Sequence, residues 1–435
     1  MFIRKRVLAT LALAAAAALA LAGCSGGSGA GAGSGSGSGE ATFDPNQKVE
    51  LTFTYWGTDD RANRFNALIA EFNKKYPNIT INSTFTDYSS YWEKRQTEAA
   101  GGGLPDVWLF SNVYLRQYGQ AGYLYDLSQV SKEVDLKAFT GPLKASGTLD
   151  GKQLSLPTGY SVWANFVNDD LLASTGVSDP KGGTSADEFG SWMKSVTSAG
   201  NGAVYGGTDP TQRIQNFELA LRAQGKNLYT QDGQLGFTQK QLRDFWASGA
   251  ADRKDVTIPQ SKLEEISPKS GLGAKLTASE MSWSNFLGSY LTDSGSSHIS
   301  MVAPPTAKQG SKDLYAQTGL QMAISANSKH PQAAALFLNY VVNSEKAGEL
   351  FGTTLGFPAS KTMLSGVKLE GADKEVSDYI ASVKARVGDA PPVPVVGYGA
   401  LEQKFWDLGK AIGLGSVSVD DAVTQFFAEA KTTLG

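Results

Sequence analysis

The fold is decided by the stretch Val49-Glu50-Leu51-Thr52-Phe53-Thr54-Tyr55-Trp56-Gly57. Its odd positions are apolar and its even positions are polar up to Tyr55, which is the period of a β-strand with one buried face. Trp56 and Gly57 then indicate a turn. The next segment changes period, because apolar residues from Phe65 to Phe72 recur at i, i+3, i+4 and i+7. That spacing predicts a helix, which Pro77 ends.

The same alternation continues along the chain. A second strand is predicted from Ile79 to Phe85, a helix around Tyr91 to Ala100, and a third strand from Val107 to Phe110. Strands that alternate with helices predict a mostly parallel α/β sheet. Ligands of such sheets bind at the carboxyl ends of the strands, so we expect a site near Trp56 and near Asn112.

Later segments repeat these patterns without an internal repeat. Extended chain is predicted at 154–167, 299–303 and 321–325, and helices at 185–199, 211–224, 238–248, 284–292, 331–342, 399–412 and 418–431. A non-repetitive chain argues against an adhesin or a structural protein of the cell wall.

The N-terminal segment resembles the leader of bacterial lipoproteins. Three basic residues from Arg4 precede an uncharged apolar run from Val7 to Ala22, as in a secretory signal. Leu21-Ala22-Gly23-Cys24 resembles a lipobox, which implies palmitate on Cys24 and anchoring at the outer face of the cell membrane. An ordinary signal peptide with an incidental cysteine is the alternative. We therefore expect a signal peptide at 1–23, and the lipidated cysteine with a Gly/Ser tether at 24–42.

Composition excludes several classes of function. The chain has 41% apolar residues, 19% charged residues and a net charge of −3, which is typical of a soluble globular protein without a nucleic-acid partner. It contains one cysteine and two histidines, so no disulfide, metal ligand set or Ser-His-Asp triad is indicated. We expect neither a metal nor a cofactor.

Several segments together resemble the family 1 extracellular solute-binding proteins of ABC importers. The landmarks are Tyr55 to Gly57, Phe72 to Pro77, Gly102 to Val107, Asn168 to Leu171 and Gly319 to Leu338. The sequence departs from the family at Val167, where a tyrosine is usual. Their joint order over much of the chain carries the resemblance, because each landmark alone is common.

The resemblance implies an α/β fold of the two-lobed periplasmic-binding-protein type (type II). Each lobe would be a mostly parallel sheet flanked by helices, and three crossings of the chain would form a hinge. Proline or glycine in extended chain suggests crossings near Pro157 to Tyr160, Val302 to Pro305, and Leu355 to Pro358. The expected N-terminal lobe is then 43–157 with 304–355, and the C-terminal lobe is 158–303 with 356–435.

A sugar site needs aromatic faces together with paired polar groups. Residues of these types at strand ends or crossings are the candidates for ligand binding: Trp56, Thr58, Asp59, Phe110, Ser111, Asn112, Tyr160, Ser161, Trp163, Asp209, Arg213, Trp283, Asn285, Gly356, Phe357 and Tyr398. Asp106, after Pro105, is expected to order its turn instead of contacting a ligand.

The sequence-based hypothesis is a monomeric transport protein, not an enzyme, that binds a mono- or oligosaccharide between its lobes and delivers it to an ABC permease. Other small polar ligands remain open: an amino acid held by Asp209 and Arg213, or a polyamine held by convergent carboxylates. An extracellular glycoside hydrolase is the alternative from another class, and it would need two positioned carboxyl groups.

Overall fold

The predicted first strand is present as β1 (Val49–Trp56) in the computed structural model, which describes residues 43–57, 59–139 and 141–435. The side chains of Val49, Leu51, Phe53 and Tyr55 are at most 3% exposed, so the apolar positions of the alternating pattern face a core. The expected signal peptide, Cys24, the tether and Thr58 lie outside the described residues.

A five-stranded sheet is built around β1. The strand order is β2-β1-β3-β11-β6, with β2 (Ile79–Thr86), β3 (Val107–Phe110), β11 (Gln321–Ile324) and β6 (Leu156–Pro157). β1 pairs in parallel with β2 and β3, which confirms the parallel arrangement predicted there. β11 runs antiparallel to β3 and β6.

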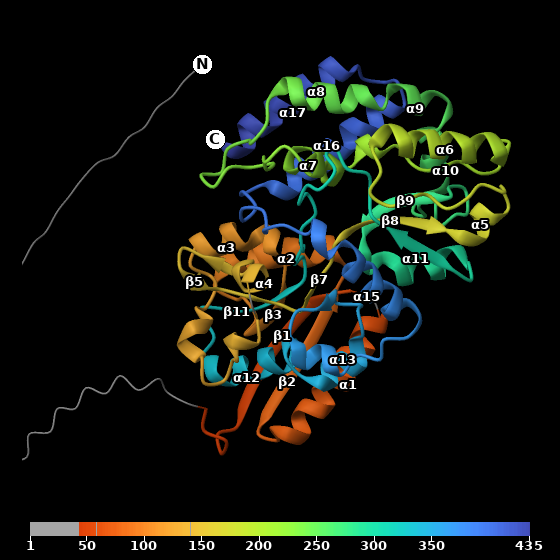
Figure 1. Cartoon of the computed structure of the whole chain (residues 1–435). Helices are drawn as coiled ribbons and strands as arrows, with labels where there is room; N and C mark the ends of the chain where they lie inside the picture. The colour runs from red at the N-terminus through yellow and green to blue at the C-terminus, as the bar shows by residue number, and fades with distance from the viewer. Residues whose placement is uncertain (1–42, 58, 140) are drawn as a thin grey trace, which may run out of the picture. The chain divides into compact units, whose positions relative to one another are not determined.

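Helices pack on both faces of this sheet, and together they form what we call the first lobe (Figure 1). One core contains the buried side of β1 with α1 (Asp59–Lys75), α12 (Pro331–Val342) and α13 (Glu345–Phe351). The opposite core contains α2 (Tyr88–Gly101) and α3 (Leu115–Gln120). Asp106 joins β1 to the segment after β11, because its carboxylate accepts hydrogen bonds from Thr52 N at 2.9 Å and Ser328 Oγ at 2.7 Å. Asp106 thus joins segments that are distant in sequence, instead of ordering only its own turn.

The second lobe is built on a smaller sheet of order β10-β8-β9, with β10 (Ile299–Val302), β8 (Trp163–Asn168) and β9 (Ser279–Trp283). Both pairings are antiparallel, so the expectation of a mostly parallel sheet in each lobe is wrong here. Long helical segments separate β8 from β9. The direction of each strand depends on where these segments bring the chain back to the sheet. Local periodicity does not record that. β9 itself was missed because Ser279 and Glu280 look exposed, although they are 1% and 5% exposed.

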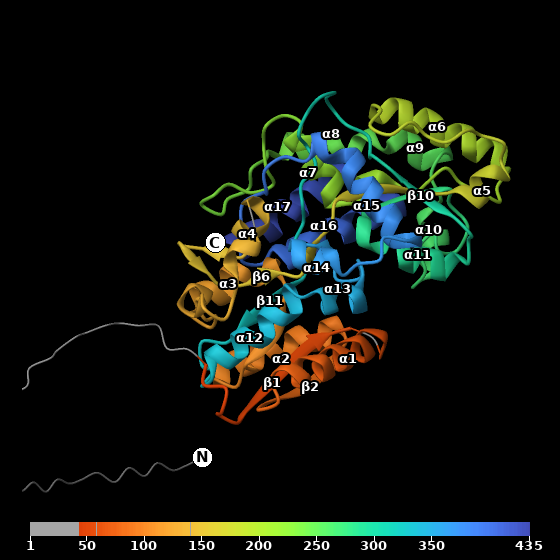
Figure 2. The same cartoon turned by 60° about the horizontal axis from the view of Figure 1, so that its bottom comes forward.

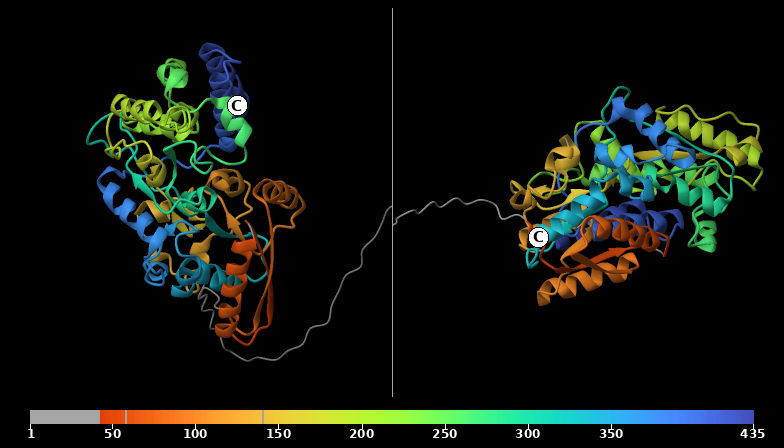
Figure 3. Two further views of the ribbon diagram at one scale, coloured as in Figure 1. Left: turned by 90° about the vertical axis from the view of Figure 1, so that its right-hand side faces the viewer. Right: turned by 90° about the horizontal axis from the view of Figure 1, so that it is seen from below.

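Helices complete this lobe (Figures 2 and 3). Its buried apolar side chains form three further cores. The capping boxes of Ser185 with Glu188 and Thr238 with Gln241 start two of the helices. In a core at the end of the chain, Trp246 packs against Phe405 with ring centroids 4.9 Å apart. The helices are α5 (Asp169–Ala173), α6 (Ala186–Gly200), α7 (Ile214–Arg222), α8 (Gln239–Ser248), α9 (Ala250–Asp255), α10 (Gln260–Ile266), α11 (Leu287–Ser294), α15 (Gly371–Val383), α16 (Tyr398–Gly413) and α17 (Val419–Leu434).

Three segments that link the lobes lie side by side. β7 (Gly159–Tyr160) pairs antiparallel with β12 (Phe357–Pro358). Ser161 and Gln317 exchange two backbone hydrogen bonds of 2.9 and 2.8 Å. Gly356 has φ of +91°, and a Cβ there would lie 2.8 Å from Tyr160 N, so the close approach of the strands requires glycine.

Two of these crossings lie at other positions than those expected from the proline residues. Leu314 still packs in a core of the second lobe, and Leu320 is in contact with the first. An ion pair between Asp313 and Arg386, 2.8 Å apart, holds the intervening loop to the second lobe. After Phe357 touches the second lobe, Met363 packs in the first, and Ala372 is in the second again. Within the described part of the chain, none of the helices has the length and apolarity that a membrane crossing requires.

Candidate functional site

A cavity of about 620 Å³ lies where the two lobes meet. The first lobe contributes Trp56 at the end of β1, Ser111 after β3, and Ser146. The second lobe contributes α7, the end of β9 and the start of α16. The crossing segment 315–319 and the proline-rich segment 390–394 complete its walls. The carboxyl ends of β1 and β3 thus border the cavity, as the strand–helix alternation predicted.

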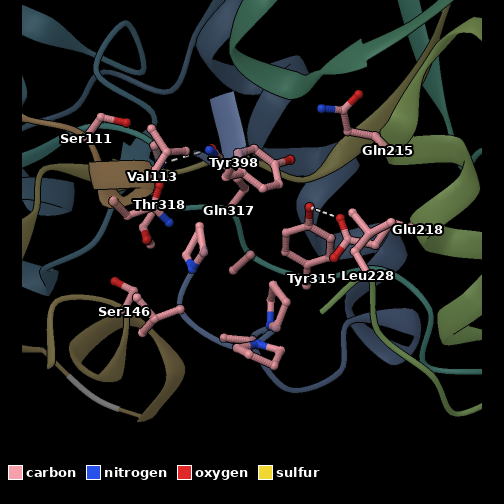
Figure 4. A pocket seen from close by; sticks show the side chains of 18 of the residues that line it. Ser111, Val113, Ser146, Gln215, Glu218, Leu228, Tyr315, Gln317, Thr318 and Tyr398 are labelled. Carbon is pink, nitrogen blue, oxygen red and sulfur yellow. Dashed lines mark hydrogen bonds between the residues drawn. The ribbon is translucent and has the colours of Figure 1, made fainter. Parts of the chain in front are cut away.

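Hydroxyl and amide groups line the first-lobe side of the cavity (Figure 4). They include Ser111, Asn112, Ser146, Gln317 and Thr318. The hydroxyls of Ser146 and Thr318 each accept a hydrogen bond from Gln321 Nε2 at 3.1 Å, which fixes their positions. The Oδ1 atom of Asn112 is buried and has no partner among the described residues. An unpaired buried acceptor costs about 1–3 kcal/mol, so a ligand that donates a hydrogen bond there would recover this energy.

Aromatic side chains come from both lobes. Tyr88 and Phe286 line the cavity yet remain 46% and 43% exposed, so both have surface free for a ligand. Trp283 is held by edge contacts with Trp163 and Tyr315, at centroid distances of 5.0 and 5.7 Å. Rings with one supported side and one open side are suited to contact the weakly apolar face of a sugar ring.

Two carboxyl groups, Glu218 on α7 and Glu402 on α16, line the second-lobe side of the cavity. Glu218 is 3% exposed and accepts a hydrogen bond from Tyr315 Oη at 2.7 Å. Glu402 accepts one from Gln215 Nε2 at 2.5 Å. Burial raises the pKa of Glu218 to about 7 and also raises the pKa of Glu402.

Sequence reasoning missed both carboxyl groups. A signal was present, because Ile214, Phe217, Glu218 and Leu221 share the i, i+3, i+4, i+7 spacing of a buried helix face. A carboxyl group in an apolar stripe must find a partner or a binding role, since leaving it unpaired is costly.

The cavity collects five of the sixteen predicted site residues: Trp56, Ser111, Asn112, Trp283 and Tyr398. The other candidates that the structure describes do not line this cavity. Tyr160, Gly356 and Phe357 are in the crossings, while Ser161 donates to Asn285 Oδ1 at 3.0 Å beside them. Phe110 is fully buried in a core, Trp163 lies behind Trp283, and Asp59 is exposed at the start of α1. Phe110 is directed into a core while its neighbour Ser111 lines the cavity, because side-chain direction alternates along extended chain.

Asp209 and Arg213 lie at smaller cavities in the second lobe. Asp209 accepts hydrogen bonds from Thr211 N at 2.9 Å and Arg253 Nη1 at 3.0 Å, and Arg213 lies over the ring of Trp406 at 4.6 Å. Each therefore already has a partner within the protein. The part of the chain that the structure describes contains no group of three or more His, Cys, Asp or Glu side chains that could hold a metal ion.

Comparison with known proteins shows which family has this architecture. The family model described as bacterial extracellular solute-binding protein matches residues 67–381. A protein of Brucella abortus described as a binding protein is 20% identical over 381 residues, which is 83% of this chain and 88% of the relative.

Two solved structures are similar in fold. An oligogalacturonide-binding protein of Yersinia enterocolitica, in complex with saturated digalacturonic acid, has 19% identity and a TM-score of 0.77 over 89% of this chain and all of that chain. A substrate-binding protein of Listeria monocytogenes, in complex with cycloalternan, has 18% identity and a TM-score of 0.76 with the same coverage. These similarities show that the chain has the periplasmic solute-binding fold. The match to the family model shows to which family the chain belongs. The chain belongs to the bacterial extracellular solute-binding proteins.

Proposed function

We propose that this protein binds a mono- or oligosaccharide in the cavity between its lobes and delivers it to an ABC permease. The observation that carries the proposal is the composition of the cavity. Aromatic rings with open faces come from both lobes, and hydroxyl, amide and carboxyl groups are placed between them. That combination matches the apolar faces and hydroxyl edges of sugars. The two solved relatives with named carbohydrate ligands support it.

Capture without chemistry is the proposed mode of action. A ligand that contacts Tyr88 and Phe286 at once would join the lobes and favour a closed form over an open one. The short strands β7 and β12 and the segment around Gln317 are positioned to absorb the backbone change. The closed form would be the one that the permease recognises.

Thermal unfolding tests this function. The full chain is mixed with mono-, di- and trisaccharides, with amino acids and spermidine as the contrasting panel. A saccharide that binds only the folded state is expected to stabilise it by about 2.7 kcal/mol at a hundredfold excess over Kd. Stabilisation by amino acids or spermidine alone would contradict the proposal. Recovery of the saccharide unchanged is the second readout, because its hydrolysis would indicate a glycoside hydrolase.

Location is proposed from the N-terminal sequence. Cys24 would carry palmitate and hold a monomeric protein at the outer face of the cell membrane. In bacteria supplied with labelled palmitate, the parent chain is expected to take up label and to sediment with membranes, whereas Cys24→Ser loses both properties. Ser28→Ala, in the same Gly/Ser segment, serves as the control. Label retained by Cys24→Ser would refute the lipid anchor.

A further inference from the structure

The ionisable side chains that line the cavity are acidic. Among the described residues that line it, Glu218 and Glu402 are the side chains that can carry a full charge near neutral pH, and none is Lys, Arg or His. An anionic ligand would therefore meet repulsion from two carboxylates without a compensating cation in the lining. A neutral or cationic ligand would not.

Both carboxyl groups have unused capacity for hydrogen bonds. Tyr315 Oη donates to Glu218 Oε2, and Gln215 Nε2 donates to Glu402 Oε1. Within residues 43–57, 59–139 and 141–435, no further protein donor reaches the other oxygen of either group. An ionised carboxylate offers about four acceptor sites. Most of this capacity is left for a donor that the protein does not supply.

The two arginines that influence these carboxyl groups electrostatically have other partners. Arg222 donates to the backbone oxygens of Asp313 and Asp389 at 2.9 and 2.6 Å and to Asn227 Oδ1 at 3.1 Å. Arg213 lies over the ring of Trp406, as Lys410 does. Both arginines act at a distance to lower the pKa of a carboxyl group, Arg222 on Glu218 and Arg213 on Glu402, but burial is the larger effect and raises both values. Neither carboxyl group is therefore paired directly with an arginine of the described part of the chain.

Aromatic rings surround the same wall. Tyr229 and Tyr398 are 5.8 Å apart with their planes at 67°, and Tyr315 adjoins Glu218. Burial raises the pKa of all three phenols, so they stay neutral. The hydroxyl of Tyr229 is buried without a partner among the described residues. Ring faces attract cations, so rings and carboxyl groups favour the same kind of ligand group.

This inference rests on the proposed function and narrows its ligand class. We propose that the ligand is a saccharide with a protonated amino group, which binds at Glu218 and Glu402 while sugar hydroxyls face Ser111, Asn112 and Thr318. The ammonium group donates up to three hydrogen bonds to oxygens that lack protein donors. The carboxyl wall then selects for the amino group, and the first-lobe side holds the sugar.

Isothermal titration of the full chain at pH 7 tests this with two matched probes. The β-1,4-linked disaccharide of glucosamine and cellobiose share rings and linkage, and differ in an amino group or a hydroxyl at C2. The amino disaccharide is expected to bind about tenfold or more tightly than cellobiose, in line with a charge-assisted hydrogen bond. Glu402→Gln is expected to bring the ratio of the two dissociation constants close to one.

Glu218→Gln provides a second variant with the same expected loss of preference, and Glu265→Gln is the control because its carboxyl group is exposed on α10. If cellobiose binds as tightly as the amino disaccharide, or if both cavity variants keep the parent ratio, the inference fails while the proposed function stands. If neither disaccharide nor any neutral sugar binds, or only spermidine binds, the proposed function fails and this inference fails with it.

Discussion

Trp283→Ala is expected to weaken binding of the most stabilising saccharide by about thirtyfold or more, corresponding to about 2 kcal/mol. Trp283 lies at the end of β9 with its ring held between Trp163 and Tyr315 and its surface in the cavity wall. Truncation removes a large apolar contact. Because the ring is already held in place, its removal saves little of the entropy cost of ordering on binding. Isothermal titration measures the change in Kd.

Trp192→Ala is the matched control for that variant. Trp192 is also a partly buried tryptophan of the second lobe, but it stacks on Phe189 and donates to Ser178 O at 2.9 Å, away from this cavity. Both variants should lose some stability, whereas only Trp283→Ala should lose affinity. Equal affinities for the parent and Trp283→Ala would remove the cavity from the proposed function.

Glu218→Gln is expected to raise the free energy of unfolding by about 3 kcal/mol at pH 8 and by only about 1 kcal/mol at pH 5. Burial raises the pKa of Glu218 in the folded protein to about 7 from an ordinary value of 4.5. The folded state therefore binds more protons than the unfolded state between these values, and the stability of the parent falls as pH rises through this window. Glutamine keeps the shape and avoids the cost of ionising a buried group.

Urea unfolding of both proteins at pH 5, 6, 7 and 8 measures that difference. Repulsion from Glu402 adds to the raised pKa of Glu218, so the measured difference includes the interaction between the two carboxyl groups. Glu265→Gln, with an exposed carboxyl group, should follow the parent at every pH. A gap between parent and Glu218→Gln that is the same at pH 5 and pH 8 would contradict the assigned burial effect.

The elements of the first lobe could be predicted because each is encoded by a local pattern. The helix expected at 331–342 is α12 (Pro331–Val342), since its proline fits the first turn and its apolar residues share one face. The missed strand β9 shows the limit. Ser279 and Glu280 are polar residues on a buried strand, where Ser279 Oγ donates to Gly206 O at 2.7 Å and Glu280 accepts from Leu272 N at 3.1 Å. These contacts, 73 residues away in the chain for Ser279 and across a loop for Glu280, are not visible in the local pattern of polar and apolar residues.

The residues of the candidate site also fall into those that the sequence predicts and those that it does not. Trp56, Ser111 and Asn112 were predicted because they follow parallel strands whose ends meet at one edge of a sheet. Glu218 and Glu402 are 184 positions apart on two helices, and only packing of α7 against α16 brings their carboxyl groups to one wall.

The sequence by itself determined the alternation of strands and helices, the membership suggested by ordered motifs, and the aromatic residues at strand ends, because each depends on residues that are near one another in the chain. The tertiary structure alone decided the antiparallel second sheet, the true places of the crossings, and which side chains enter the cavity. These depend on where distant segments return and which way each side chain points, and both are settled by the packing of the two lobes.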